Sequence, residues 1–393
     1  MKKYFTILLL LTIAGCSKQD SGELPFGNGS RYPHLTKTES DGLLVSWFEP
    51  VDSTIFGLFW SEFSNNEWSV KTLIYSSDHF FINWADFPSI FELNDSTLVS
   101  HWLEMSGKNT YDYDVKVIHS TDRGKTWSEP ISPHRDEKEA EHGFVSFYKN
   151  ETHELEMVWL DGREMAGGHG HESAGDMNLY TTSFDRDFKQ RHDISIDAMV
   201  CECCPTTAVQ LENVTLVAYR DRTPSDVRNI NILRKVNGEW ENPYPVNEDG
   251  WIISGCPVNG PKLAEKNGKV AITWFTAPDG EPQINVAFSN NQGKTFSEPI
   301  RVDAGKPQGR VDLEWLDEKT IIASWLEADE EYSSIVYRKI DINGTLSEIS
   351  YVESLGGGRG IGYPQFELME DKTLFVWTNP LEKNQIISRW IDL

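Results

Sequence analysis

One short pattern recurs along the whole chain: an aromatic residue ends an apolar run, and a polar or acidic residue follows two positions later. Successive copies lie 51 to 60 residues apart and begin at Trp47, Trp102, Trp159, Tyr219, Trp274, Trp325 and Trp377. The apolar runs are rich in strand-forming residues and follow turns rich in Asp, Asn or Gly, which is typical of β-strands. A repeat of this length predicts similar β units that bury their faces by stacking on one another.

A second pattern alternates with the first. Residues 120–127 match Ser-x-Asp-x-Gly-x-Thr-Trp in full, and residues 289–296 match it with Asn291 for Asp and Phe296 for Trp. These turns resemble the Asp boxes of bacterial neuraminidase (BNR) repeats, and the resemblance implies a sialidase-like β-propeller. Residues 30–393 are therefore expected to form one all-β domain, a β-propeller of four-stranded blades. Seven repeats favour seven blades, six as in sialidases being the alternative, with residues 22–30 as a candidate closing strand.

The N-terminus has the features of an export signal. Two Lys precede an apolar run, residues 5–13, that is too short to span a bilayer. The segment Ile13-Ala14-Gly15-Cys16 resembles the bacterial lipobox, which implies lipidation of Cys16. We expect residues 1–15 to be a lipoprotein signal peptide and residues 16–29 a lipid-anchored tether, so that the protein sits on a membrane of the bacterial cell envelope. An ordinary secretory signal with a chance Cys is the alternative.

Charge limits the partners. Lys and Arg number 36 against 61 Asp and Glu, a net charge of −25, which argues against nucleic acid because its binding depends on clustered basic residues. Many of the Arg nevertheless fall in loops that the repeat places on one face of a propeller. Arg side chains bind carboxylates through paired hydrogen bonds. An acidic glycan is therefore the expected partner, bound by a monomeric protein.

The resemblance to sialidases implies an exo-glycoside hydrolase that needs no cofactor. In that family Arg side chains bind the substrate carboxylate, a Tyr paired with a Glu attacks the sugar, and an Asp is the acid/base. The catalytic candidates here are Arg31 (in Arg31-Tyr32-Pro33), Arg310, Arg359, Tyr363 and Asp161, with Asp78 as a second candidate for the acid. Arg163, Arg220 and Arg222 are candidates for substrate binding. The competing interpretation is that these Arg pair with the repeat carboxylates and hold the blades together.

Cysteine and histidine suggest a different function. Thiolate and imidazole suit Cu(I) or Zn(II), and a metal site or redox centre would draw on His142, His169, His171, Cys201, Cys203 and Cys204. Disulfides are the alternative in an exported protein, because four Cys remain once Cys16 is lipidated. One possible pairing joins Cys203 to Cys204 and Cys201 to Cys256. In the other, Cys256 pairs with either of the neighbouring residues Cys203 and Cys204. A third hypothesis is a non-catalytic surface module that binds glycan or protein.

Overall fold

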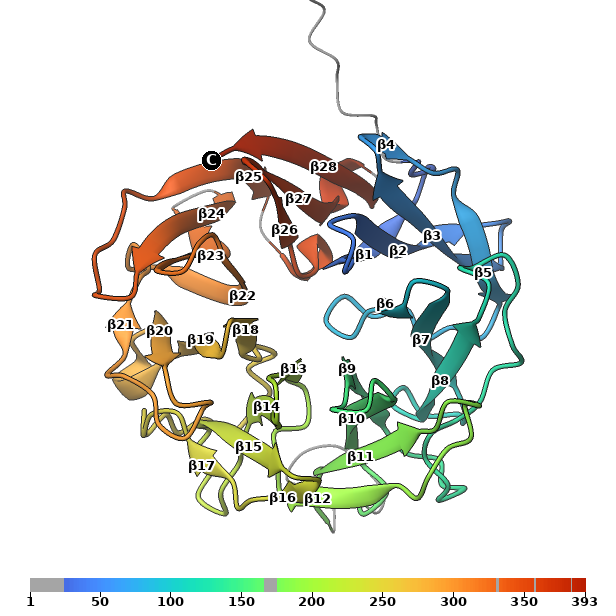
Figure 1. Ribbon diagram of the computed structural model, residues 1–393, viewed down its shortest axis with the longest axis horizontal. Coiled ribbons are helices and arrows are strands. Elements are labelled where there is room, and N and C mark those ends of the chain that lie inside the picture. Colours follow the sequence, from blue (N-terminus) through green and yellow to red (C-terminus); the bar gives the residue numbers. More distant parts are fainter. Residues whose placement is uncertain (1–24, 166–174, 330–331, 357, 383) are drawn as a thin grey trace, which may run out of the picture.

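Seven antiparallel sheets form a closed ring in the computed structural model, which describes residues 25–165, 175–329, 332–356, 358–382 and 384–393 (Figure 1). The all-β propeller expected from the sequence is confirmed, and seven blades rather than six are present. In the described residues the helical elements are short 3-10 turns, η2 (Pro278–Gly280), η3 (Arg359–Ile361) and η4 (Pro380–Glu382). Among these residues no helix has the length and apolar character needed to cross a membrane.

The strands follow the chain order blade by blade. Blades 1 and 2 contain β1 (Arg31–Lys37), β2 (Leu43–Pro50), β3 (Phe56–Ser64), β4 (Glu67–Trp68) and β5 (Thr72–Ser77), then β6 (Ser89–Asn94), β7 (Thr97–Met105) and β8 (Tyr113–Ser120). Blades 3 and 4 contain β9 (His142–Lys149), β10 (Leu155–Asp161), β11 (Asn178–Phe184) and β12 (Ile194–Ala198), then β13 (Thr207–Gln210), β14 (Val214–Arg220), β15 (Ile230–Val236), β16 (Glu239–Trp240) and β17 (Tyr244–Pro245). Blades 5, 6 and 7 contain β18 (Lys262–Lys266), β19 (Lys269–Thr276), β20 (Gln283–Ser289) and β21 (Ile300–Arg301), then β22 (Pro307–Trp315), β23 (Thr320–Ala328), β24 (Tyr332–Asp341) and β25 (Ser350–Gly356), then β26 (Gln365–Met369), β27 (Lys372–Asn379) and β28 (Gln385–Asp392).

The outermost strand departs most from the four-stranded plan. In blades 1 and 4 it is split into two short pieces that both pair with the third strand. In blade 2 an isolated bridge between Val117 and Ile131 takes its place. Blade 7 has three strands, and residues 25–30, the described part of the candidate closing strand, form no strand. Ser30 instead accepts a hydrogen bond from the Ile386 amide, which joins the two ends of the described chain.

The aromatic repeat is explained by burial and by one recurring hydrogen bond. All six Trp of the repeat and Tyr219 are at most 1% exposed, in the second strand of each blade. The indole N–H of Trp47, Trp159 and Trp325 donates to the acid two residues later, at 3.1, 2.7 and 2.6 Å. In these three blades the repeated acid is the acceptor that lets a buried indole keep its hydrogen bond, whereas the Trp102 indole of blade 2 has no such partner among the described residues. In blade 5, where Thr276 replaces the acid, Trp274 donates to Asp249 instead.

Side-chain packing closes the ring evenly. Each of the seven apolar clusters in the described residues joins two neighbouring blades, and the cluster between blades 3 and 4 also includes Ala85 and Tyr363 from the loops before blades 2 and 7. The cluster that contains Leu35, Trp47, Leu374 and Val376 joins blade 1 to blade 7. Blade stacking therefore buries faces that a lone blade would expose.

Hydrogen bonds between innermost strands or the loops leading to them cross all seven blade interfaces. From the interface of blades 7 and 1 onward, the pairs are Leu35 N with Gln365 Oε1, Ile90 N with His34 Nδ1, Phe144 N with Asp86 Oδ2, Thr206 Oγ1 with Phe144 O, Leu263 N with Thr207 Oγ1, Arg310 N with Asn259 Oδ1, and Phe366 N with Asp312 Oδ2. These side chains satisfy backbone groups of strands that have no further strand on their inner side. They hold the ring together at its axis.

Candidate functional site

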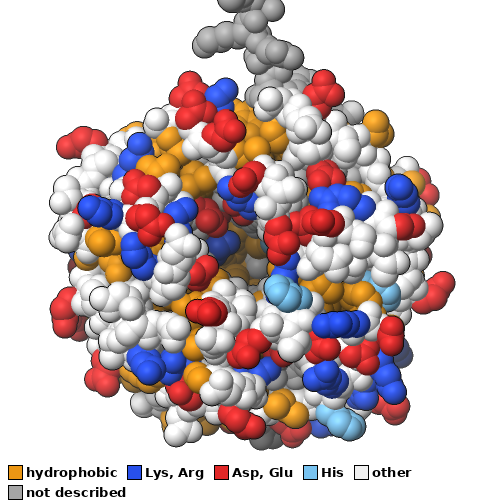
Figure 2. Space-filling model, viewed as in Figure 1, with side chains coloured by type: hydrophobic (Ala, Val, Ile, Leu, Met, Phe, Trp, Pro, Cys, Tyr) orange, Lys and Arg blue, Asp and Glu red, His pale blue; other side chains and the backbone are white. Residues whose placement is uncertain are grey.

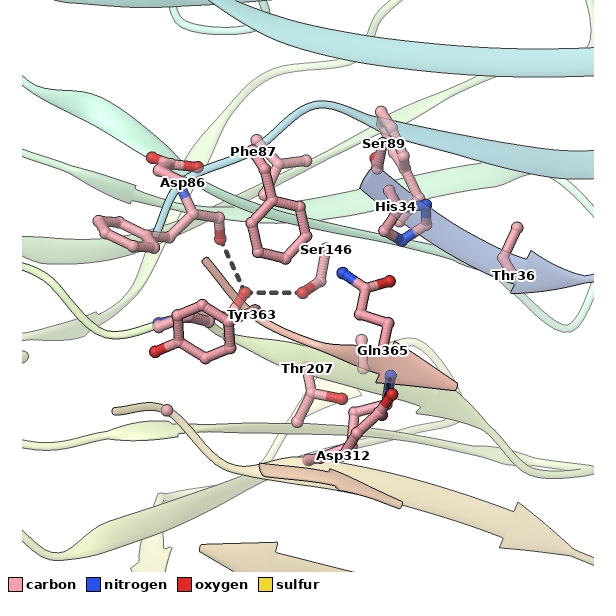
Figure 3. A pocket seen from close by; sticks show the side chains of 18 of the residues that line it. His34, Thr36, Asp86, Phe87, Ser89, Ser146, Thr207, Asp312, Tyr363 and Gln365 are labelled. Carbon is pink, nitrogen blue, oxygen red and sulfur yellow. Dashed lines mark hydrogen bonds and ion pairs between the residues drawn. The ribbon is translucent and has the colours of Figure 1, made fainter. Parts of the chain in front are cut away.

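Two cavities lie near the axis, one lined mainly by innermost strands and the other by loops. The cavity in Figure 3, of about 280 Å³, is lined by the innermost strands, including His34, Asp86, Thr207, Asp312 and Gln365. These five side chains all belong to the interface hydrogen bonds just described. The polar side chains in this part of the channel therefore serve to hold the blades together. Figure 2 shows the ring hollowed at its centre, with basic side chains visible inside the hollow.

The second cavity, of about 360 Å³, is built by loops. Its lining includes Trp84, Tyr113, Glu141, Glu202, Cys203, Arg222, Arg228, Cys256 and Arg359. These residues lie in loops that lead into a new blade or join the second and third strands of a blade, or where such a loop meets a strand. Both kinds of loop open on the same face of a propeller. We take this loop cavity as the candidate functional site.

A buried phenol–carboxylate pair forms one wall of the loop cavity. The Tyr113 hydroxyl donates to Oε1 of Glu141 at 2.6 Å, although the two residues belong to neighbouring blades. Burial raises the pKa of Glu141 well above its usual value, and the nearby Asp86 carboxylate adds to the shift. Burial, and then the Glu141 charge, raises the pKa of Tyr113 as well. Both the carboxyl group and the phenol of this buried pair therefore hold a proton more tightly than they do in water, and the phenol proton lies in the contact between them.

Arg side chains and an indole form another wall. The guanidinium carbons of Arg310 and Arg359 lie 4.6 and 5.9 Å from the ring centroid of Trp84, within cation–π range. Arg310 donates to the carbonyl oxygens of Gly358 and Gly362, whereas Arg359 is exposed at the cavity. Across the cavity lies Arg222, which is ion-paired to Glu202 at 2.9 Å and hydrogen-bonded to Asp226. The site therefore offers positive charge beside an aromatic surface.

Four of the sugar-site residues predicted from the sequence come to this region. Arg359 and Arg222 line the loop cavity, and Arg310 reaches it through Trp84. Tyr363 stacks on Trp84 at 6.2 Å between ring centroids, but its hydroxyl donates to the Val258 carbonyl at 2.6 Å. Burial raises the pKa of Tyr363 strongly. The phenol that contacts a glutamate is thus Tyr113 and not Tyr363.

The other predicted sugar-site residues are engaged elsewhere. Arg31 donates to the Gly29 carbonyl and lies 4.9 Å from the Phe56 ring, away from the loop cavity. Arg220 is 1% exposed and donates to three backbone carbonyls, those of Asn259, Arg228 and Phe275. These contacts hold blades 4 and 5 together through backbone carbonyls, whereas the competing interpretation expected the repeat carboxylates as partners.

Asp161 is enclosed by donors. It accepts the Trp159 indole N–H and two hydrogen bonds from the Arg163 guanidinium, at 2.8 and 2.6 Å. Arg163 also pairs with Asp193 at 2.8 Å and lies 3.9 Å from the Tyr180 ring. Asp78, the second candidate for the acid, is exposed and contacts His79. Neither Asp lines the loop cavity.

The predicted cysteine–histidine cluster separates into two groups. The Sγ atoms of Cys201, Cys203 and Cys204 lie within 4.8 Å of one another, and none of the four cysteines in the described residues is in a disulfide. Cys201 and Cys204 are the close pair, at 3.2 Å, which neither of the disulfide pairings from the sequence anticipated. His169 and His171 lie outside the described residues, as does Cys16 with the whole predicted signal peptide.

His142 belongs with carboxylates instead of thiols. Its ring stacks on His134 at 3.7 Å, and its Nε2 lies 3.3 Å from Asp136 and 3.6 Å from Asp161. The predicted grouping of His142 with the cysteines is therefore wrong, because the residue faces the interface of blades 2 and 3. Here it contributes to a buried charge network.

Sequence reasoning missed the phenol–glutamate pair. Glu141 directly precedes His142, in the loop that leads into blade 3, but Tyr113 stands in no motif. The two are 28 positions apart, and only the stacking of blades 2 and 3 brings them together. The rule that both kinds of loop share a face was the available signal.

Comparison with known proteins supports the fold. No protein-family model matches the chain, and no curated protein sequence is similar to it. Among solved structures, an ulvan lyase bound to -[GlcA(1-4)Rha3S]- is similar with a TM-score of 0.58 and 11% identity, over 94% of this chain and 93% of that one. A protein of unknown function from Dyadobacter fermentans (TM-score 0.50, 14% identity, 93% and 94% covered) and an α-L-arabinofuranosidase from Fusarium graminearum (0.50, 12%, 93% and 93%) are also similar. At these identities the likeness shows a shared propeller fold.

Proposed function

We propose that this propeller is a glycan-acting enzyme that hydrolyses a glycoside of an acidic sugar in the loop cavity. The observation that carries the proposal is the 2.6 Å hydrogen bond from Tyr113 to Glu141 at the wall of a cavity that also holds Arg222, Arg228 and Arg359. Propellers that act on glycans share the fold, as the ulvan lyase and the arabinofuranosidase do by their names. The cell-envelope location expected from the lipobox suits an enzyme that meets extracellular glycans.

The chemistry follows from the charges in the cavity. A sugar carboxylate placed by Arg359 and Arg222 repels a carboxylate nucleophile, whereas a neutral phenol meets no such repulsion. Tyr113 attacks the anomeric carbon as its proton passes to Glu141, and the glycosidic bond breaks as the leaving oxygen takes a proton from solvent. A water molecule then cleaves the bond between Tyr113 and the sugar and releases one proton to solvent, while Glu141 returns its proton to Tyr113. Trp84 offers an apolar surface for the sugar ring, beside the two guanidinium groups.

The test is turnover of a panel of acidic glycosides by the purified full chain, with sialosides, uronic-acid glycosides and sulfated polysaccharides as substrates. Tyr113→Phe and Glu141→Gln should each lower kcat by about 10²-fold or more while circular dichroism and the melting temperature show a folded ring. The matched control is Tyr148→Phe, which removes another buried phenol that donates to a glutamate, Glu156, at 2.8 Å but lies outside the cavity. Its kcat should stay within about twofold of wild type.

Two results would reject the proposal. Binding of acidic glycans without any turnover would make the protein a recognition module. Formation of an unsaturated sugar would show elimination instead of hydrolysis.

A further inference from the structure

Three cysteine sulfurs gather in a tight turn that the proposed glycan chemistry does not use. Residues 201–204 connect β12 to β13, and the Cys201 amide is fixed by a 3.0 Å hydrogen bond to the Arg220 carbonyl. The turn brings the first and last of its sulfurs to 3.2 Å and keeps the Cys203 sulfur within 4.8 Å of both. Three soft donors are therefore already placed around one point.

The surroundings keep this group dry except on one side. Cys201 and Cys204 are each 1% exposed, and Cys203 packs against an apolar cluster that includes Val200, Phe144 and Tyr363. Cys203 also lines the loop cavity, so one sulfur can be reached from solvent. The possible metal ligands in this group, among the described residues, are three sulfur atoms, with no imidazole or carboxylate.

A buried cation beside the sulfurs favours negative charge on the group, in addition to the charge of the nearby Asp226 and Glu202 carboxylates. Arg228 is 2% exposed, and its Nε and Nη1 have no hydrogen-bond partner of normal geometry among the described residues. Its Nη2 lies 3.7 Å from Asp226, and the guanidinium interacts with the Cys201 sulfur. A guanidinium is always charged, and burying it without anions nearby is costly. A neutral disulfide between Cys201 and Cys204 would leave Arg228 without its thiolate, whereas thiolates held on a metal would balance it.

We propose that Cys201, Cys203 and Cys204 bind one Cu(I) ion as a three-coordinate thiolate site, with Arg228 as its buried counter-charge. Each thiol releases its proton to solvent as its sulfur binds, so that three thiolates and one Cu(I) carry a net charge of −2. Soft thiolates select Cu(I) or Zn(II), but structural Zn(II) takes four ligands. Cys256, the remaining candidate, is outside the group of three: its sulfur contacts Cys203 alone among them and lies 3.9 Å from Glu202.

The experiment uses the full chain, reduced and kept anaerobic, titrated with Cu(I) in competition with a chromogenic Cu(I) chelator. One equivalent should bind, and X-ray absorption at the copper edge should show sulfur neighbours only, with an average number of three. Cys201→Ser and Cys204→Ser should each weaken the affinity by at least about 100-fold. Cys256→Ser is the matched control and should bind like the wild type. Arg228→Met should weaken binding by about tenfold or more, and Arg228→Lys by less.

The outcomes separate this site from the glycan chemistry. Glu141→Gln, the variant without its catalytic base, should bind Cu(I) normally, so that loss of one activity leaves the other measurable. Substoichiometric Cu(I) in a folded, fully reduced chain overturns the proposal. Binding of one equivalent of Zn(II) that is lost in Cys256→Ser also overturns the proposal, because this result would show a zinc site with four cysteine ligands. A Cys201–Cys204 disulfide that mild reductants leave intact also overturns it.

Discussion

Asp161 illustrates at the scale of single residues why an acid in a suggestive loop need not be catalytic. The sequence shows a carboxylate after a buried strand, which is equally compatible with an acid/base and with a structural acceptor. The structure assigns its oxygens to the Trp159 indole and the Arg163 guanidinium. Which of the two roles Asp161 has depends on the direction of the Arg163 side chain after the strand ends. The periodicity of the strand does not determine that direction.

Asp161→Asn should therefore lower stability without changing the specific activity of the molecules that remain folded. Removing the charge that pairs with a largely buried Arg163 should cost about 3 kcal/mol in the free energy of unfolding. Urea denaturation measures this loss. Glu104→Gln is the matched control, because it changes the same repeat position in blade 2, where the Trp102 indole has no hydrogen-bond partner among the described residues. Equal losses in the two variants would show that the indole–acid–guanidinium contact contributes nothing.

Two Arg that look alike in the sequence should separate in a kinetic experiment. Arg359→Gln should raise KM for an acidic glycoside about tenfold and leave kcat within twofold, because it removes a charge that binds ground and transition states alike. Arg31→Gln should change neither constant, because Arg31 is engaged with Phe56 and Gly29 outside the cavity. A large effect of Arg31→Gln with none of Arg359→Gln would return the carboxylate site to blade 1.

The candidate site was accessible from the sequence only in outline. The repeat correctly sorted loops by face, because alternate connections of an antiparallel blade must emerge on opposite sides. That rule gathers Arg222, Arg359, Cys203 and Cys256. It does not pair Tyr113 with Glu141, since the contact depends on the lateral stacking of two blades and on side-chain direction.

At the scale of elements, the Asp-box turns are devices that let one blade approach the next. In the first, the Asp122 carboxylate accepts hydrogen bonds from the Thr126 amide and hydroxyl, at 2.9 and 2.7 Å. Gly124 follows with a φ of +77°, and a Cβ placed there would lie 2.1 Å from the Trp60 ring of blade 1. Gly293 holds the same position in the second box, and a Cβ placed there would lie 2.6 Å from the Leu216 side chain of blade 4. The motif glycine therefore serves the turn and the blade interface together.

Gly124→Ala should cost clearly more than the same change in an open turn. The positive φ alone costs an alanine about 1 kcal/mol, and displacing Trp60 should add about 2 kcal/mol as overpacking. Gly268→Ala is the control, because Gly268 has a φ of +80° with nothing within 4 Å of the added Cβ. Thermal and urea denaturation of both variants measure the difference. Equal losses would mean that Trp60 moves aside freely.

The repeat predicted the second strand of each blade well and the outermost strands poorly, because the hydrophobic signal in the sequence depends on how deeply a strand is buried. Second strands are buried on both faces, so their apolar runs are long and unbroken, as in β14 and β10, which are buried throughout. Outer strands such as β4 and β17 are two residues long and partly exposed, so they carry little hydrophobic signal. The closing strand expected over residues 22–30 is not formed in its described part, residues 25–30, where core packing and side-chain hydrogen bonds fix blade 7 to blade 1 instead.

At the scale of the whole molecule, the inner hydrogen bonds make the ring sensitive to pH. The buried side chain of Asp86 accepts a hydrogen bond from the Phe144 amide at 2.8 Å, which joins blades 2 and 3. Burial raises its pKa to about 7, and the Phe144 hydrogen bond opposes the shift only in part. The folded ring thus keeps a proton on Asp86 that an unfolded chain releases near pH 4.

Asp86→Asn should change the pH dependence of stability in a defined direction. Between about pH 4 and pH 7 the folded wild type binds more protons than the unfolded chain, so its free energy of unfolding falls as the pH rises. The difference of about three pKa units corresponds to at most about 4 kcal/mol, which the amide variant does not lose because it cannot ionise. Urea denaturation at intervals from pH 4 to pH 8 should therefore show the wild type losing stability relative to Asp86→Asn, with no further change above pH 8. Parallel curves for the two proteins would mean that Asp86 is ionised in the folded ring and that the raised pKa is wrong.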